Sequence, residues 1–292
     1  MELVRNSVKL VDLAEPGRKI EYAGKVCYKS QGNITDTSYE KFITNIIKSE
    51  HTSVIEHESR LFMFGKDLYD SQYHIYFDDN HYANITREGD FIFVSGNIRM
   101  WYSLLKDVDE KSAPFLQGLS TKLNEDYPYI FKNLNVSLTC KYSKEAEDLC
   151  NNLDKHKLYT FEIVGSRSFT HQIVRHRTLS FSQESQRYCN YSGGKFNHSI
   201  RIVDSVMPPG TEDLLQEMEN TYFRLIDEGM KPEDARQILP NCAASTIVVS
   251  GTLDNWKKYL HLRVDTHAQR EIREISETIM HYLHLTKQDI GR

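Results

Sequence analysis

The segment from Arg175 to Tyr188 constrains this chain most, because any fold must accommodate its dense set of hydrogen-bond donors. Its sequence, RHRTLSFSQESQRY, holds three arginines, one histidine, three serines and one tyrosine against a single acid, Glu184. Arginine forks bind phosphate or carboxylate oxygens in bidentate fashion, and hydroxyls donate to the remaining lone pairs. Packing these groups without an anion would leave donors unsatisfied. The segment therefore favours an anion site over a solvated charged loop.

The overall composition is that of an ordinary globular protein. The 292 residues are 39% hydrophobic and 26% charged, enough for one large domain or two modest ones, and we expect a single domain over residues 1–292. The net charge of −5 argues against the broad basic surface of a general nucleic-acid binder. We therefore expect no nucleic-acid partner, although one local basic pocket for a small anion is compatible with this charge.

The cysteines and the N-terminal residues bear on the cellular compartment. The cysteines are odd in number and scattered without a CxxC pair, which favours neither a disulfide framework nor a zinc site: Cys27, Cys140, Cys150, Cys189 and Cys242. The first residues alternate apolar and polar, and no run is apolar enough for a signal peptide or a membrane span. We expect a cytoplasmic protein with no membrane partner and no bound metal.

The spacing of apolar residues predicts a mixture of strands and helices. Strands are expected at residues 2–13, 60–64 and 158–164. Helices are expected at residues 38–49, 168–174, 211–228 and 254–285, the last in one or two pieces, with a short helix from Pro232 to Pro240. Residues 66–157 are less regular and are interpreted as an elaboration packed on the core, with helices at 113–124 and 143–153.

One internal similarity stands out within this irregular region. Residues 91–105, FIFVSGNIRMWYSLL, resemble residues 246–260, TIVVSGTLDNWKKYL. Both have a β-rich run, a Ser-Gly pair and then a helical pattern that holds a tryptophan. Two copies do not make a repeat array. Coincidence and a real duplication are about equally compatible with the sequence.

Two further polar clusters accompany the arginine-rich segment. Arg263, His267 and Glu271 are spaced four residues apart, which predicts one polar face of the last helix, although exposed ion pairs alone have the same spacing. His51, Ser53, Glu56 and His57 form the other cluster; their spacing is not HExxH, and no third metal ligand lies nearby.

No nucleophile is evident from the sequence. Cys242 has small and apolar neighbours, which is typical of a buried structural thiol. Ser185 lacks the GxSxG pattern of a nucleophile elbow.

Taken in order along the chain, these segments resemble the flavin-dependent thymidylate synthases. That family carries the signature RHRxxSxNExSxRY, which residues 175–188 match at seven of nine fixed positions, with Ser182 for the Asn and Gln183 for the Glu. Residues 51–57 resemble its HxTxxEH segment, with Ser53 for Thr. Residues 234–240, DARQILP, resemble its ARxxLP segment, and residues 260–272 resemble its LRxDxHAQxEI helix.

The resemblance implies a function and a fold. The function is the reductive methylation of dUMP to dTMP, with methylenetetrahydrofolate as one-carbon donor and NADPH as reductant through bound FAD. A flavin carries the difficult chemistry, while the protein supplies binding, orientation and electrostatics. The implied fold is α/β of the α+β type, a twisted, largely antiparallel sheet flanked by helices, with residues 66–157 as a long insertion. A homotetramer with active sites at subunit interfaces is implied as well.

The resemblance also assigns roles to individual residues. Arg263 would be catalytic, stabilising charge that develops on the pyrimidine, and His51 would lie on the folate side of the flavin. Gln183 keeps the reach of a glutamate without its charge, so we expect it to hydrogen-bond the ligands. The residues expected to bind dUMP are Gln172, Arg175, Gln183, Ser185, Arg187, Arg236 and Arg263. Those expected to bind FAD are Ser53, Arg175, His176, Arg177, Gln183 and His267.

A departure from the family precedes the last helical region. Compact members place an Asn-x-Arg there and a second Asn six residues after the first, whereas this chain has Thr252, Asp254 and Lys258. An aspartate is a poor neighbour for the phosphates of FAD. The similar segment at residues 91–105 does contain Asn97 and Arg99. Our hypothesis is that this pair supplies the missing FAD contacts.

Two other functions remain open from the sequence. One is a nucleotide- or phosphate-binding regulatory protein that keeps the anion site without turnover, which the neutral Gln183 makes conceivable. The other is a structural RNA-binding module, which the net charge disfavours. Bound flavin and NADPH-dependent dTMP formation would distinguish the enzyme from both.

Overall fold

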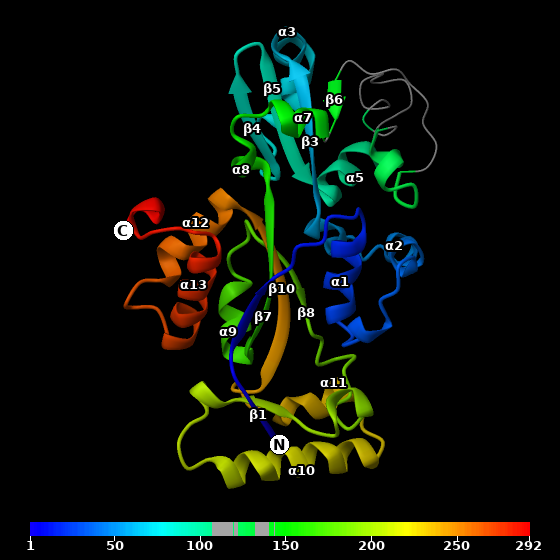
Figure 1. Cartoon of the computed structure of the whole chain (residues 1–292). Helices are drawn as coiled ribbons and strands as arrows, with labels where there is room; N and C mark the ends of the chain where they lie inside the picture. The colour runs from blue at the N-terminus through cyan, green and yellow to red at the C-terminus, as the bar shows by residue number, and fades with distance from the viewer. Residues whose placement is uncertain (107–118, 120–121, 132–139, 143) are drawn as a thin grey trace.

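Most of the β-structure lies in two antiparallel sheets, one above the other in Figure 1. The computed structural model describes all residues except 107–118, 120–121, 132–139 and 143. The central sheet has the order β2 (Ser7–Leu10), β7 (Leu158–Ser166), β10 (Ala244–Thr252), β8 (Ser180–Gln183). The upper sheet has the order β4 (Ala83–Glu88), β5 (Phe91–Asn97), β3 (Ser59–Gly65), β6 (Cys140–Tyr142). Separately, β1 (Glu2–Val4) pairs in parallel with β9 (Arg201–Val203).

Helices flank both faces of the central sheet (Figure 1). On one side lie α9 (Arg167–Ile173), α12 (Leu253–Arg263) and α13 (Arg270–Tyr282). On the other lie α1 (Arg18–Val26) and α2 (Ser38–Lys48), followed by the 3₁₀ segment η2 (Thr52–His57). Below the sheet lie α10 (Glu212–Asp227) and α11 (Pro232–Ala235). The remaining helices accompany the upper sheet: α3 (Lys66–Leu68), α4 (His74–Phe77), α5 (Ile98–Lys106), α7 (Lys144–Leu149) and α8 (Leu153–His156).

The predicted fold class is confirmed, since the sheets are largely antiparallel and flanked by helices. The strand expected over residues 2–13 is wrong as one element: Arg5 and Asn6 separate β1 from β2, which join different sheets. The last helical region forms two helices, α12 and α13. Most of the helix expected at 113–124 lies outside the described residues, and the one at 143–153 is divided between α7 and the start of α8.

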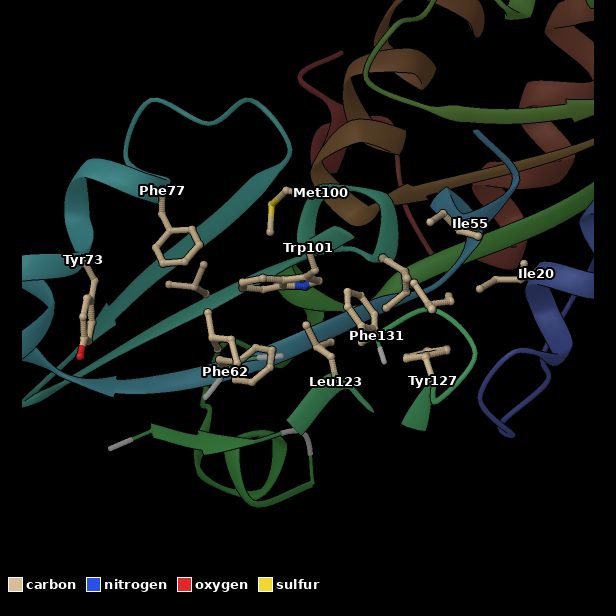
Figure 2. Close-up of a cluster of buried hydrophobic side chains, with 14 of the residues drawn as sticks. Ile20, Ile55, Phe62, Tyr73, Phe77, Met100, Trp101, Leu123, Tyr127 and Phe131 are labelled. Carbon is tan, nitrogen blue, oxygen red and sulfur yellow. The ribbon is translucent and has the colours of Figure 1, made fainter. Parts of the chain in front are cut away.

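Aromatic side chains pack edge to face in both sheet cores. In the central core, the ring of Phe161 on β7 meets Trp256 of α12 edge to face, with centroids 5.2 Å apart. In the upper core, Phe62 of β3 meets Trp101 of α5 at 4.9 Å (Figure 2). Ile20 and Ile55 belong to the upper core too. Because these isoleucines come from α1 and η2, apolar burial of about 1.5–3 kcal/mol per side chain fixes both segments against the upper sheet.

The two similar segments of the sequence adopt one local structure. Each forms a strand that runs directly into a helix, β5 into α5 and β10 into α12. Asn97 accepts a hydrogen bond from the Met100 amide, and Thr252 accepts one from the Asn255 amide. Both are N-cap contacts to the third residue of the helix, which stabilise the first turn. The similarity therefore extends from sequence to capping and to the buried tryptophan.

Two buried histidines make stability depend on pH. Burial lowers the pKa of His57 to about 3 and that of His156 to about 4, from an ordinary 6.5. Below pH 6.5 the unfolded chain therefore binds protons that the folded chain does not, so stability falls as the pH falls towards 4. We expect the urea midpoint to be lower at pH 5 than at pH 7. This decrease in midpoint should be smaller in His156→Gln than in the parent. In the control His81→Gln it should equal that of the parent, because His81 is exposed. An equal decrease in the parent and both variants would contradict the prediction.

Candidate functional site

Five residues singled out by the sequence line one cavity of about 390 Å³. His51 and Ser53 come from the start of η2, Gln183 and Ser185 from the end of β8 and the turn beyond it, and Arg99 from α5. A volume of this order is typical of small-molecule sites. Segments more than a hundred residues apart thus form one concave surface.

Two tyrosines at the cavity were not assigned by sequence reasoning. The rings of Tyr28 and Tyr188 also line it, with centroids 5.3 Å apart and an interplanar angle of 37°. Both side chains are exposed. Exposed aromatic faces of this kind suit a planar ring system in a ligand. Tyr188 belongs to the arginine-rich segment, but nothing in the sequence pairs it with Tyr28.

The two departures from the family signature have structural explanations. The Gln183 amide nitrogen donates to Thr170 Oγ1 at 3.0 Å and to Ser245 Oγ at 3.1 Å. A carboxylate cannot donate these bonds, because it is an acceptor only. Ser182 is buried behind the cavity wall, where its hydroxyl lies 3.0 Å from His57 Nε2. Both side chains are thus adapted to neighbouring strands and helices of this chain.

The arginines that begin the motif have no acidic partner in the described part of the chain. Arg175 and Arg177 are exposed and form no ion pair there. The Arg263 Nε donates to His176 Nε2 at 2.8 Å. Burial, and then the charge of Arg263, lower the pKa of His176 to about 4, so the neutral ring accepts this bond at pH 7. The group carries positive charge that is available to an anion.

The other predicted ligand residues lie in separate places. Arg187 and Arg236 meet at Glu233: Arg187 Nε lies 2.7 Å from its carboxylate, and Arg236 Nε donates to its carbonyl oxygen at 3.1 Å. The Gln172 side chain donates to Gln269. Arg187 also contacts two residues that line the cavity, because its amide donates to Ser185 Oγ at 3.3 Å and its guanidinium lies 5.3 Å from the Tyr188 ring centroid. Neither Gln172 nor Arg236 is among the described residues that line the cavity, so the structure gathers the predicted site only in part.

The expected polar face of the last helix is wrong. Residues 264–269 interrupt the helix, so Arg263 ends α12, His267 lies in the connection and Glu271 begins α13. His267 is exposed and lies 2.7 Å from Asp265. Glu271 is buried and accepts hydrogen bonds from the Ser166 amide and hydroxyl. Spacing alone did not reveal this break.

Other potential reactive groups are inert in the described residues. Cys27 lines the cavity, but burial raises the pKa of its thiol, which disfavours a thiolate nucleophile. The described cysteines are unbridged, and no cluster of His, Cys, Asp or Glu among the described residues is arranged to hold a metal. None of the described helices combines the length and apolarity needed for a membrane span. A slightly larger cavity, about 430 Å³, contains no motif residue.

Comparisons with known proteins agree with the motif. The model of the family described as thymidylate synthase complementing protein matches residues 9–66 and 153–285. The flavin-dependent thymidylate synthase of Geobacter sulfurreducens is 36% identical over 126 residues, which is 42% of this chain and 54% of that protein. The flavin-dependent thymidylate synthase of Pyrococcus furiosus is 35% identical over 128 residues, which is 42% of this chain and 52% of that protein. The chain therefore spans about half the length of the curated relatives it matches.

One solved structure aligns over nearly the whole chain. It is a UMP/dUMP methylase, PolB from Streptomyces cacaoi, bound with 5-Br dUMP. The alignment covers 97% of this chain and 92% of that one, with 16% identity and a TM-score of 0.39.

Because Arg175 and Arg177 are exposed and unpaired, replacing them should affect ligand binding rather than folding. We expect Arg175→Ala and Arg177→Ala to weaken dUMP or flavin binding by about tenfold, the loss of one charge-assisted hydrogen bond. The free energy of unfolding should change by no more than about 0.5 kcal/mol. Calorimetric titration and urea unfolding measure the two effects. Arg224→Ala, an exposed arginine on α10, serves as the control, and equal ligand affinity in all variants would exclude these arginines from the site.

Proposed function

Because the chain belongs to the thymidylate synthase complementing protein family, we propose that it is a flavin-dependent thymidylate synthase that methylates dUMP to dTMP. One observation carries the proposal: motif residues from η2, α5 and β8 line a single cavity, at the signature segment of the chain. The names of the relatives from Geobacter and Pyrococcus support the same reaction.

The substrate would be held mainly through its phosphate and the edge of its base. Exposed, unpaired Arg175 suits the phosphate, and Ser185 at the cavity adds a hydroxyl donor. The side-chain oxygen of Gln183 accepts no hydrogen bond from the described residues, so it is free for a donor on the base. We assign the remaining dUMP contacts to Gln172, Arg187, Arg236 and Arg263.

Donors that line the cavity, and arginines of the motif outside its lining, suit FAD. Arg99 and Ser53 line the cavity, unpaired Arg175 and Arg177 suit a diphosphate, and Tyr28 and Tyr188 offer exposed aromatic faces. His176, His267, Gln183 and Asn97 complete the assigned set, with His51 towards the folate. When bound, the flavin would carry reducing equivalents from NADPH to the one-carbon unit of methylenetetrahydrofolate.

Arg263 is the residue we assign to catalysis. Its Nε is bonded to neutral His176, which fixes the guanidinium and leaves its terminal nitrogens for the pyrimidine. Since His176 carries no charge at pH 7, the positive charge at this point belongs to Arg263 alone. A fixed cation stabilises negative charge that develops on the ring in the transition state.

The assembly and location complete the proposal. Arg175 and Arg177 are exposed without acidic partners in the described chain, and His267 is exposed beside Asp265, which suits a homotetramer with sites at subunit interfaces. Light scattering of the purified protein measures the mass of the assembly and so tests the tetramer. The unbridged cysteines suit a cytoplasmic location.

The decisive experiment supplies the purified protein with FAD, NADPH, methylenetetrahydrofolate and dUMP. We expect dTMP to form, and Arg263→Ala to lower kcat by about 10²- to 10³-fold, the usual loss for one electrostatic donor. Flavin absorbance should be retained in this variant. Flavin binding by the parent protein without any dTMP would favour the regulatory alternative instead.

Arg99 should contribute to flavin binding. It lines the cavity and pairs with Glu56, and a guanidinium there suits a phosphate oxygen. We expect Arg99→Ala to raise the Kd for FAD about tenfold, measured by flavin fluorescence. Lys106→Ala, an exposed cation on the same helix, should leave the Kd unchanged. Equal affinity of Arg99→Ala and the parent would exclude Arg99 from the flavin site.

A further inference from the structure

The two main sheets have the same arrangement of strands. From one edge to the other, β6-β3-β5-β4 in the upper sheet corresponds to β2-β7-β10-β8 in the central sheet, and all pairs are antiparallel (Figure 1). The registers agree as well, because cross-strand pairs of the upper sheet have counterparts in the central sheet. The upper-sheet pairs Leu61–Ser95, Phe62–Val94 and Thr86–Phe93 correspond, in that order, to the central-sheet pairs Thr160–Ser250, Phe161–Val249 and Ser182–Val248. The similarity of residues 91–105 and 246–260 is therefore part of a larger correspondence.

Two buried histidines occupy matching positions in this arrangement. His57 lies two residues before β3, and His156 lies two residues before β7. His57 Nδ1 is 2.8 Å from Ser250 Oγ, and its Nε2 is 3.0 Å from Ser182 Oγ. His156 Nδ1 is 2.9 Å from Ser95 Oγ, and its Nε2 is 2.8 Å from Thr86 Oγ1. The same ring nitrogens meet hydroxyls on corresponding strands.

These contacts cross between the two sheets. His57 precedes a strand of the upper sheet but bonds to the central sheet, and His156 does the reverse. The edge strands cross in the same way: β2 precedes β3 in the chain but pairs with β7, whereas β6 precedes β7 but pairs with β3. Each half of the chain thus supplies the other with one strand and one histidine.

We propose that residues 7–106 and 140–263 are two copies of one structural unit, and that His57 is a positioning residue for the ligand site. The first copy includes residues 66–106, and the second residues 140–157, of the stretch that the sequence suggested was an insertion. The positioning role rests on the proposed function, because the ligands are those of the enzyme.

The geometry around His57 explains why it would position the site. Its neighbours in η2 line the cavity, and so does Gln183, next to Ser182. The ring is fully buried and neutral, so it offers one donor and one acceptor, and two hydroxyls satisfy both. The bridge from His57 to Ser182 and Ser250 therefore fixes η2 against β8 and β10, and with it the cavity-lining residues of η2 and β8.

The corresponding place in the other copy is closed by protein groups. The Glu88 carboxylate accepts hydrogen bonds of 2.7–3.0 Å from the amides and side chains of Asn151 and Asn152. Glu184, at the position matching Glu88, turns instead to Arg201 and Tyr191. Among the described residues no carboxylate accepts a hydrogen bond from Thr52 or Ser53, which match Asn151 and Asn152, so the copy that faces the motif keeps its cavity.

The duplication provides a matched pair of variants. Ser250→Ala and Ser95→Ala remove the same hydroxyl from corresponding histidines, and both serines are buried. We expect both variants to unfold at lower urea concentrations than the parent. Only Ser250→Ala should weaken dUMP and FAD binding, by about tenfold, because only His57 belongs to a segment, η2, whose residues line the cavity. Ser182→Thr should retain parental affinity, since Thr86 makes the corresponding contact in the other copy, whereas Ser182→Ala should lose it.

Hydrogen exchange tests the positioning role without turnover or ligand. In Ser250→Ala, the amides of residues 51–56 should exchange faster than in the parent. In Ser95→Ala, the amides of residues 150–155 should exchange faster than in the parent. If the protein makes no dTMP, the proposed function fails while this exchange pattern still stands. Unchanged exchange at 51–56 in Ser250→Ala, or equal loss of ligand affinity in both serine variants, would overturn the role of His57.

Discussion

The ladder between β7 and β10 is the interaction on which the rest of the site depends. All nine residues of β10 pair with β7, and all nine are buried. A strand with no exposed face must satisfy its backbone groups within the sheet, so its register is strongly fixed. The ladder leads into α9 at the end of β7 and into α12 at the end of β10, and β8 pairs with its other edge. Gln183 and Arg263 lie on these elements, and Arg175 follows the end of α9.

The charge at the site follows from which groups are allowed to ionise. Burial keeps His57 and His176 neutral at pH 7 and assigns them to hydrogen bonding. The positive charge therefore resides on arginines. Arg175 and Arg177 remain exposed, and an exposed charge needs no ion pair because water solvates it. The chain can hold them ready for an anionic ligand at little cost to folding.

The sequence predicted those parts of the structure that depend on local pattern. The motif identified the residues of β8 and the turn after it that line the cavity, and apolar spacing predicted α2, α9 and α10. It did not predict the break at residues 264–269, nor the partners of Gln183, which come from α9 and β10. Periodicity reports which face is buried but not which distant segment covers it.

In the two proposed copies, each half of the chain packs against the sheet of the other, and this arrangement accounts for the altered Asn-x-Arg turn. Arg99 on α5 and Asp254 on α12 hold the same position in the two copies. The helix α5 packs against η2, so Arg99 reaches the cavity beside Glu56. The helix α12 packs correspondingly against α8, where the residue matching Glu56 is Lys155. The signs of both charges are thus reversed between the copies. On the proposed function an arginine is needed where a ligand cavity remains, whereas Asp254 belongs to the copy in which Glu88 bonds to Asn151 and Asn152 at the corresponding place.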